Sequence, residues 1–247
     1  MTRNMYGIIL WLFCIISPFT LIPFERAVIR FAGAQPVSMT FSMLAVMAIE
    51  AIIIYGIFVF FGMRWAERLG IRFLLLEKNS DFKNDIVKPG LVAGAVCALA
   101  VLLLDALLPS SPYNLFALAQ SISPVVGFLS LFVCIVNQDV FVCLFCISGI
   151  AILLKKICHE LTISTGMIIS ILISSLIFGI AHMPLFIHTT ASNIPLLVTR
   201  LIALNIVAGT TFGMLFWKKS FETAVFAHVV VDFVLYVLVP LGSMFVR

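Results

Sequence analysis

Long apolar runs, separated by short polar or charged stretches, dominate the pattern of this sequence. A helix needs about 20 consecutive apolar residues to cross the core of a bilayer. Seven runs reach that length: Met5–Phe24, Val37–Gly62, Gly90–Pro109, Ile122–Leu154, Thr162–Phe186, Pro195–Trp217 and Phe221–Val239. The fourth run is long enough to form a steeply tilted helix, or a helix broken near Pro124 and Gly127. The pattern therefore predicts an all-α, polytopic transmembrane helical bundle of about seven spans.

The amino-acid composition supports the assignment to membrane proteins. The 247 residues are 63% hydrophobic and only 11% charged, which excludes a soluble globular domain of this length. The formal net charge of +4 is explained by loops that face an anionic leaflet, so no nucleic-acid partner is expected. The lipid bilayer is the first partner that the sequence predicts.

The positions of the basic residues predict an orientation. With the amino terminus in the cytoplasm, eleven of the fifteen lysines and arginines fall on the cytoplasmic side of the seven runs. Cytoplasmic loops carry an excess of such residues. We therefore expect an integral protein of the bacterial cytoplasmic (inner) membrane, with its amino terminus inside and its carboxyl terminus outside.

One charged segment separates the second run from the third. Residues 64–88 mix six basic and four acidic residues with an apolar stripe, a pattern typical of an amphipathic helix in the membrane interface. We divide the chain into N-terminal transmembrane helices over 1–121, which include this cytoplasmic loop, and a C-terminal core over 122–247. Both parts are expected to form one integral domain.

Two histidines lie inside runs that are almost free of charge. His182 stands in SLIFGIAHMP and His228 in AVFAHVVVDF. Ionisable residues are expensive in hydrocarbon, so they usually face the bundle interior and often mark a functional site. Phe178 shares a helix face with His182, and Asp232 shares one with His228, because each pair is four residues apart. Each face alone could hold only a buried hydrogen-bonded group, whereas the two together favour a shared polar cavity.

A third polar stretch interrupts the fourth run. Asn137, Gln138 and Asp139 follow one another in CIVNQDVFV. At about 100° per residue they cover roughly 200° of the helix, so they cannot all face one cavity. Asn137 shares a face with Phe141, and Asp139 is expected to point largely the other way.

At these three stretches the chain resembles the CPBP family of intramembrane endopeptidases, which includes type II CAAX prenyl proteases and lysostaphin-resistance-protein-A-like proteins. The family carries Glu-Glu-x-x-x-Arg, then Phe-x-x-x-His, then His-x-x-x-Asn or Asp on successive core helices. Phe178–His182 is similar to the second motif and His228–Asp232 to the third, and Gly209–His228 resembles the family's lead-in to the third. The resemblance covers roughly 123–239 and implies that 122–247 is a CPBP-like catalytic-type core.

The first motif departs from the family. With Phe141 as the anchor, Asn137 and Gln138 stand where the family has glutamates, and Val142 stands where it has arginine. The resemblance implies that His182 orients water, with His228 and Asp232 on the carbonyl side. An amide does not take up a proton usefully, so peptide hydrolysis by the family's mechanism loses its general base.

Two carboxylates offer replacements for the missing base. Asp139 would reach the cavity through a π-bulge or a register shift, and Glu50 in the second run would face the cavity directly. The alternative for Glu50 is a protonated side chain hydrogen-bonded between helices.

Two hypotheses for the function follow. The first is an intramembrane endopeptidase that cleaves a membrane-associated or lipidated peptide with activated water. The second is an inactive pseudoprotease that binds a membrane peptide, a lipid-linked ligand or a partner helix. A proton-driven transporter lacks the internal repeats that would support it. No metal and no other cofactor is expected, because no His-Glu-x-x-His motif occurs and the resemblance implies metal-free chemistry.

Overall fold

The computed structural model describes residues 1–31, 33, 35, 36, 38–108, 114–183 and 194–244, with the side chains of 132–135 and 194 left out. These residues form helices and no strand. The α-helices are α1 (Arg3–Phe31), α2 (Phe41–Arg68), α3 (Lys88–Leu107), α4 (Leu115–Ser121), α5 (Pro124–Asp139), α6 (Ser148–Ile157), α7 (Ile163–Ala181), α8 (Ile194–Lys218), α9 (Phe221–Phe233) and α10 (Val239–Met244). The shorter elements are the 3₁₀-helix η1 (Leu74–Leu76) and the π-helices η2 (Phe82–Val87), η3 (Val140–Ile147) and η5 (Val234–Leu238).

The predicted transmembrane bundle is confirmed. Seven helical segments of the described residues are long and apolar enough to cross a membrane: Arg3–Phe31, Phe41–Arg68, Phe82–Leu107, Val136–Ile157, Ile163–Ala181, Pro195–Lys218 and Phe221–Met244. The ends predicted at Val37, Pro109 and Phe186 lie outside the described residues. The division of the chain at 121 and 122 stays a prediction.

The fourth predicted run begins at its proline and then continues without a break. Pro124 occupies the first turn of α5, where its missing N–H costs nothing, and Ser123 caps the helix by accepting from Val126 N. The chain then passes from α5 through η3 into α6 as one helical segment. Gly127 is required within it, because a Cβ at this position would overlap the carbonyl oxygen of Tyr236.

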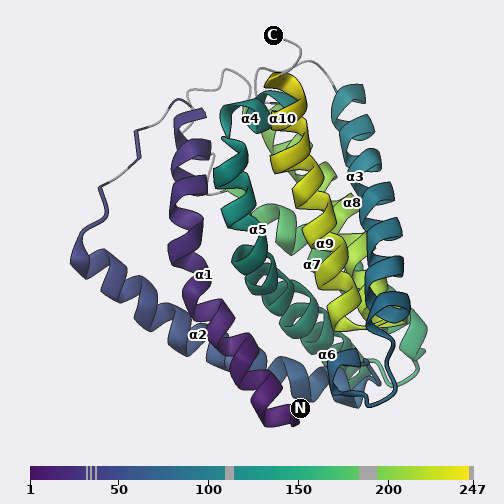
Figure 1. Cartoon of the computed structure of the whole chain (residues 1–247). Helices are drawn as coiled ribbons and strands as arrows, with labels where there is room; N and C mark the ends of the chain where they lie inside the picture. The colour runs from purple at the N-terminus through teal and green to yellow at the C-terminus, as the bar shows by residue number, and fades with distance from the viewer. Residues whose placement is uncertain (32, 34, 37, 109–113, 184–193, 245–247) are drawn as a thin grey trace.

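Helix α9 lies in the middle of the bundle, packed against α3, α8 and α5, while α7 packs against α8 (Figure 1). Helix α1 packs against α5 and α2. The N-terminal half of α2 leaves the bundle and projects to the side (Figure 1). Its large apolar side chains, including Phe41, Ile49 and Ile53, are exposed, as expected for a helix that contacts acyl chains.

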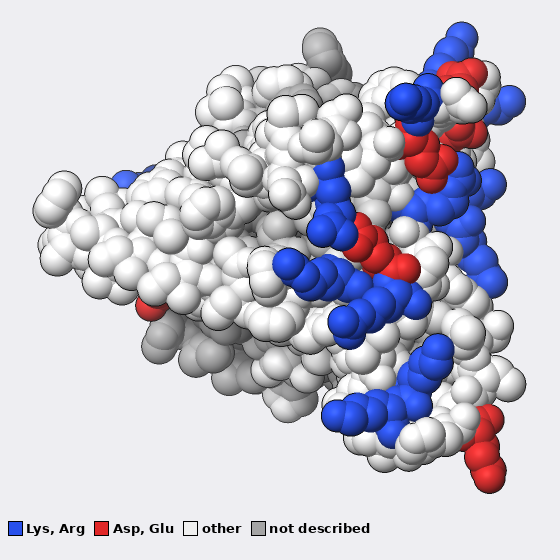
Figure 2. Space-filling view, turned by 90° about the horizontal axis from the view of Figure 1, so that it is seen from below, with Lys and Arg blue, Asp and Glu red and all other residues white. Residues whose placement is uncertain are grey.

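Charged side chains gather at one end of the bundle. The first residues of α1, α3, α7 and α9 lie there, together with the last residues of α2, α6 and α8 (Figure 1). Figure 2 views this end and shows many lysine and arginine side chains, with acidic side chains between them. The assignment of this end to the cytoplasm stays a prediction from the positive-inside rule.

The amphipathic helix predicted over 64–88 is absent from the structure. Helix α2 continues to Arg68, Gly70 turns the chain with a positive φ of 74°, and only the short η1 and η2 follow. Ile71, Phe73 and Leu74 are buried against the bundle. The prediction was wrong because the apolar stripe packs against protein instead of lying on the membrane surface.

The carboxylate of Glu222, at the start of α9, holds this loop in place. It is buried and accepts hydrogen bonds from Leu74 N at 3.0 Å and Leu75 N at 3.2 Å, so it caps η1. It also accepts the Tyr6 hydroxyl at 3.0 Å, which joins α1 to the same point. A single buried carboxylate therefore connects three distant parts of the chain.

Replacing Glu222 by glutamine is expected to destabilise this connection by about 1–3 kcal/mol, because one of the buried donors loses its acceptor. Trypsin should then cut faster after Lys78 and Lys83, which follow η1. Glu77→Gln is the matched control, since it breaks the exposed ion pair with Arg72 in the same loop. Equal digestion rates for the two variants would contradict the proposed anchoring role of Glu222.

Candidate functional site

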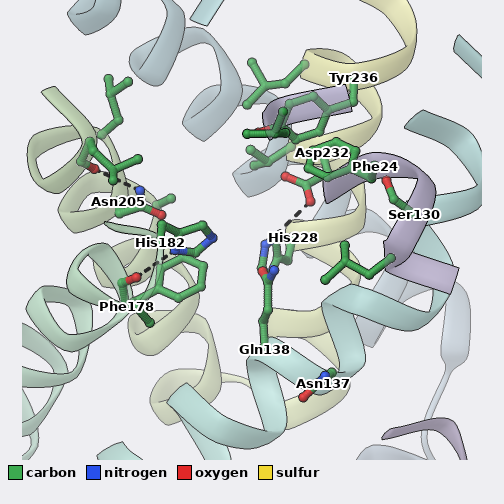
Figure 3. Close-up of a pocket in the computed structure, with 18 of the residues that line it drawn as sticks. Phe24, Ser130, Asn137, Gln138, Phe178, His182, Asn205, His228, Asp232 and Tyr236 are labelled. Carbon is green, nitrogen blue, oxygen red and sulfur yellow. Dashed lines mark hydrogen bonds and ion pairs between the residues drawn. The ribbon is translucent and has the colours of Figure 1, made fainter. Parts of the chain in front are cut away.

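The structure brings the two imidazoles to one cavity of about 360 Å³ (Figure 3). His182 enters it from the end of α7, and His228 enters from α9. The ring of Phe178 lies against both, with centroid distances of 4.7 Å to His182 and 5.9 Å to His228. The helix faces predicted from i,i+4 spacing therefore meet in space.

His182 is the C-cap of α7, and its Nδ1 lies 2.7 Å from the carbonyl oxygen of Phe178. Because a carbonyl only accepts, Nδ1 carries the proton, and Nε2 of the neutral ring is left as an acceptor. No carboxylate contacts this imidazole among the described residues. Gly179 allows α8 to approach closely here, since a Cβ on it would lie 3.1 Å from Ile202 Cα.

His228 stands between two carboxylates. Its Nδ1 lies 3.2 Å from Asp139 Oδ2, and its Nε2 lies 3.8 Å from Asp232 Oδ2. The first distance is a hydrogen bond and the second is longer than one. The ring stacks on Phe212 with a centroid distance of 4.2 Å and an interplanar angle of 20°. These contacts fix both the position and the plane of the imidazole.

Asp139 does not line the cavity, in agreement with the expectation that it points away from the face of Asn137, and the alternative that it reaches the cavity is not observed. It is the last residue of α5, only 2% exposed, on a helix that packs against α9. It therefore reaches His228 from within the packed bundle, while Asn137 and Gln138 face the cavity. The π-helix η3 begins directly after it, and π-helical turns inside α-helices are frequent at functional sites.

The two amides of Asn137 and Gln138 line the cavity. Asn137 Nδ2 donates to Ser17 Oγ on α1 at 2.5 Å, and Asn137 Oδ1 is buried without a partner among the described residues. Gln138 extends toward His228 (Figure 3). Phe141 also lines the cavity, whereas Val142 is buried elsewhere.

Glu50 does not line the cavity, so it supplies no base there. It lies exposed on the half of α2 that leaves the bundle. The sequence pattern placed it inside a span but did not reveal that its side chain is exposed on the outer face of α2. That expectation was wrong.

Several cavity residues had not been identified from the sequence. Asn205, Ser130, Tyr236 and Glu25 all line the cavity, and the first and third stand beside His182 and Asp232 respectively (Figure 3). Polar residues in the middle of apolar runs were the available signal. No lysine or arginine lines the cavity among the described residues. Nor do those residues include three His, Cys, Asp or Glu side chains grouped as a metal site requires.

Comparison with known families adds to this geometry. The family model described as "Type II CAAX prenyl endopeptidase Rce1-like" matches residues 150–234, which include His182, His228 and Asp232. This region is therefore similar to the Rce1-like family. The Rce1-like match begins after Asn137 and Phe141, so it does not contain the first motif. No curated protein and no solved structure gave a match.

Proposed function

We propose that this protein is an intramembrane endopeptidase that hydrolyses a peptide bond in a membrane-associated or lipidated substrate. The observation that carries the proposal is the position of His228, which is held by Asp139 on one nitrogen and faces Asp232 with the other. Placing two carboxylates and an imidazole inside a membrane protein is expensive, and catalysis is a common reason for it. The Rce1-like match over residues 150–234 supports this class of reaction.

In the proposed mechanism Asp139 accepts a hydrogen bond from the protonated Nδ1 of His228, which leaves Nε2 as the proton acceptor. A water molecule hydrogen-bonded to Nε2 and to Asp232 attacks the substrate carbonyl carbon and transfers a proton to Nε2. The C–N bond then breaks, and His228 returns that proton to the departing amine. In this proposal the general base is on α9, whereas in the resembled family it is a glutamate of the first motif.

The opposite wall provides groups for the substrate. Gln138 lines the cavity and its side chain extends toward His228 (Figure 3). Its amide group can therefore donate a hydrogen bond to the oxyanion. The remaining walls are largely apolar and aromatic, so they suit an extended apolar peptide or a lipidated residue.

A specific observation favours the pseudoprotease as a second candidate. Both glutamate positions hold amides, and one of these amides is bonded to Ser17 on α1. The Rce1-like match also begins beyond these positions. A site altered in this way could retain a peptide without cutting it.

A cleavage assay separates the two candidates. The purified chain is reconstituted in liposomes with internally quenched peptides that carry a farnesylated cysteine, and products are identified by mass spectrometry. The endopeptidase should cleave without any change to its sequence, because its base does not depend on residues 137 and 138. In contrast, the pseudoprotease should be silent.

Asn137→Glu/Gln138→Glu restores the carboxylates of the resembled family and tests the same point. The Ser17 hydroxyl, which now accepts from Asn137, can turn to donate to a carboxylate. If the unmodified chain is silent and the double variant gains about 10²-fold or more, the range for a general base, then the pseudoprotease is correct. Asn137→Gln/Gln138→Asn is the control for altered packing and should gain nothing.

A further inference from the structure

A groove of about 550 Å³ lies between α1 and α2, apart from the cavity of the candidate site. Its long wall is apolar and includes Ile8, Trp11, Val59 and Phe60. Ile8 and Phe60 are exposed on membrane-length helices, so in a bilayer they contact acyl chains. The groove is therefore a lipid-facing hollow and not an aqueous pocket.

Small residues keep the hollow open. Gly7 on α1 and Gly56 on α2 both line it. A Cβ at Gly56 would lie 3.3 Å from Trp11 Nε1, and this nitrogen already donates to Ile52 O at 2.9 Å. A larger residue at this position would push the indole from its place on the groove wall.

The charged end of the groove carries two arginines. Arg3 pairs with Glu67 at 2.9 Å. Arg64 has no acidic partner among the described residues, and its guanidinium lies 3.4 Å from the Phe60 ring centroid while Nη1 donates to Phe60 O at 3.1 Å. The guanidinium of Arg64 has five N–H donors, and the bond to Phe60 O uses only one of them. The other donors remain available to an anion. The groove thus has the unpaired cation of Arg64 at its charged end and apolar side chains along the rest of its length.

We propose that this groove binds one anionic glycerophospholipid. The phosphate contacts Arg64 and Arg3, and one acyl chain lies along the apolar wall between Gly7 and Gly56. Charge complementarity identifies the head group, since basic pockets between transmembrane helices bind anionic lipids. The arginines and the apolar wall belong to the same groove. This favours a lipid over free phosphate, because free phosphate would leave the apolar wall unoccupied. The proposal does not depend on the endopeptidase activity.

Native mass spectrometry of the full chain tests the site. The protein is released from micelles that contain equal amounts of palmitoyl-oleoyl phosphatidylglycerol and phosphatidylcholine. We expect preferential retention of phosphatidylglycerol, reduced about five-fold by Arg64→Gln, since one basic residue near the surface contributes about 1 kcal/mol. Arg72→Gln is the matched control: Arg72 lies in the loop that follows α2, outside the groove, and pairs with Glu77 as Arg3 pairs with Glu67. Equal retention by both variants overturns the proposal.

A second measurement uses the unmodified protein and so does not depend on how a variant folds. A phosphatidylglycerol with a diazirine in its acyl chain is cross-linked in liposomes, and labelled peptides are mapped. Labels should concentrate on 7–11 and 56–63, whereas even labelling of all lipid-facing helices would refute the site. Loss of lipid retention when millimolar inorganic phosphate is added would show that the groove binds a free anion instead.

Discussion

Replacing His228 by alanine is expected to lower kcat for peptide cleavage by about 10³-fold. The proposed mechanism makes this imidazole the group that takes the proton from water, and general bases contribute about 10²–10⁴-fold. Its ring fills a packed position between Phe212 and Asp139, so folding has to be checked for each variant by thermal unfolding in detergent. Cleavage of a farnesylated, internally quenched peptide gives the rate.

The two aspartates should behave differently from one another. Asp232→Asn removes the carboxylate that holds the attacking water, and we expect a loss of about 10²-fold or more. Asp139→Asn keeps the shape but offers an amide that can donate to Nδ1, which would stabilise the wrong tautomer of His228. Asp139→Asn should therefore lower kcat with little change in KM, which is the signature of a positioning residue.

Glu50→Gln is the matched control for these variants. Glu50 is also a carboxylate within a predicted span, but it lies exposed on α2 and away from the cavity. We expect its replacement to leave cleavage unchanged. Full activity of a folded His228→Ala variant would exclude the proposed base, and inactivation by Glu50→Gln would show that catalysis occurs elsewhere.

The bundle could be predicted from sequence because hydrocarbon imposes a simple condition on the chain. A spanning segment must satisfy its own backbone hydrogen bonds, so length and hydropathy suffice to identify it. The same reasoning failed for residues 64–88. There the apolar stripe could lie on a membrane or against protein, and the sequence does not say which. The burial of Ile71, Phe73 and Leu74 and the contacts of Glu222 show that it packs against protein.

The two helix faces that carry the histidines could also be predicted, and the contact of Asp139 with His228 could not. Helical spacing alone places Phe178 with His182 and His228 with Asp232. The contact between Asp139 and His228 depends instead on how α5 is rotated against α9, which is a property of tertiary packing. The sequence indicated that Asp139 turns away from the cavity wall of Asn137, but not that an imidazole stands on that other side.

Asp105 illustrates a further limit of hydropathy. Its place near the end of an apolar run predicts a position in the membrane interface, yet its side chain is 6% exposed and pairs with Arg200, which is 3% exposed. The pair joins α3 to α8, and Asp105 Oδ2 also accepts Leu115 N at the start of α4 at 2.9 Å. Such pairing cannot be inferred from one sequence, because Asp105 and Arg200 are 95 positions apart.

Replacing Arg200 by methionine is expected to lower the free energy of unfolding by about 3–5 kcal/mol. The change leaves the Asp105 carboxylate buried without its cation, and breaking a buried ion pair from one side carries this cost. Unfolding by sodium dodecyl sulfate from mixed micelles gives the value. The exposed pair of Arg72 and Glu77 is the control, and Arg72→Met should cost under about 1 kcal/mol.

The double variant Asp105→Asn/Arg200→Met separates the charge from the other contacts of the arginine. The amide that replaces the Asp105 carboxylate stays neutral and can still accept Leu115 N, so the uncompensated charge disappears while the connection to α4 remains. Arg200 also donates to the carbonyl oxygen of Asp105 at 2.9 Å, and this bond is lost in both variants. We therefore expect the double variant to recover most of the lost stability, but not all of it. A double variant no more stable than Arg200→Met would show that the backbone contacts of Arg200, and not its charge, hold α3 to α8.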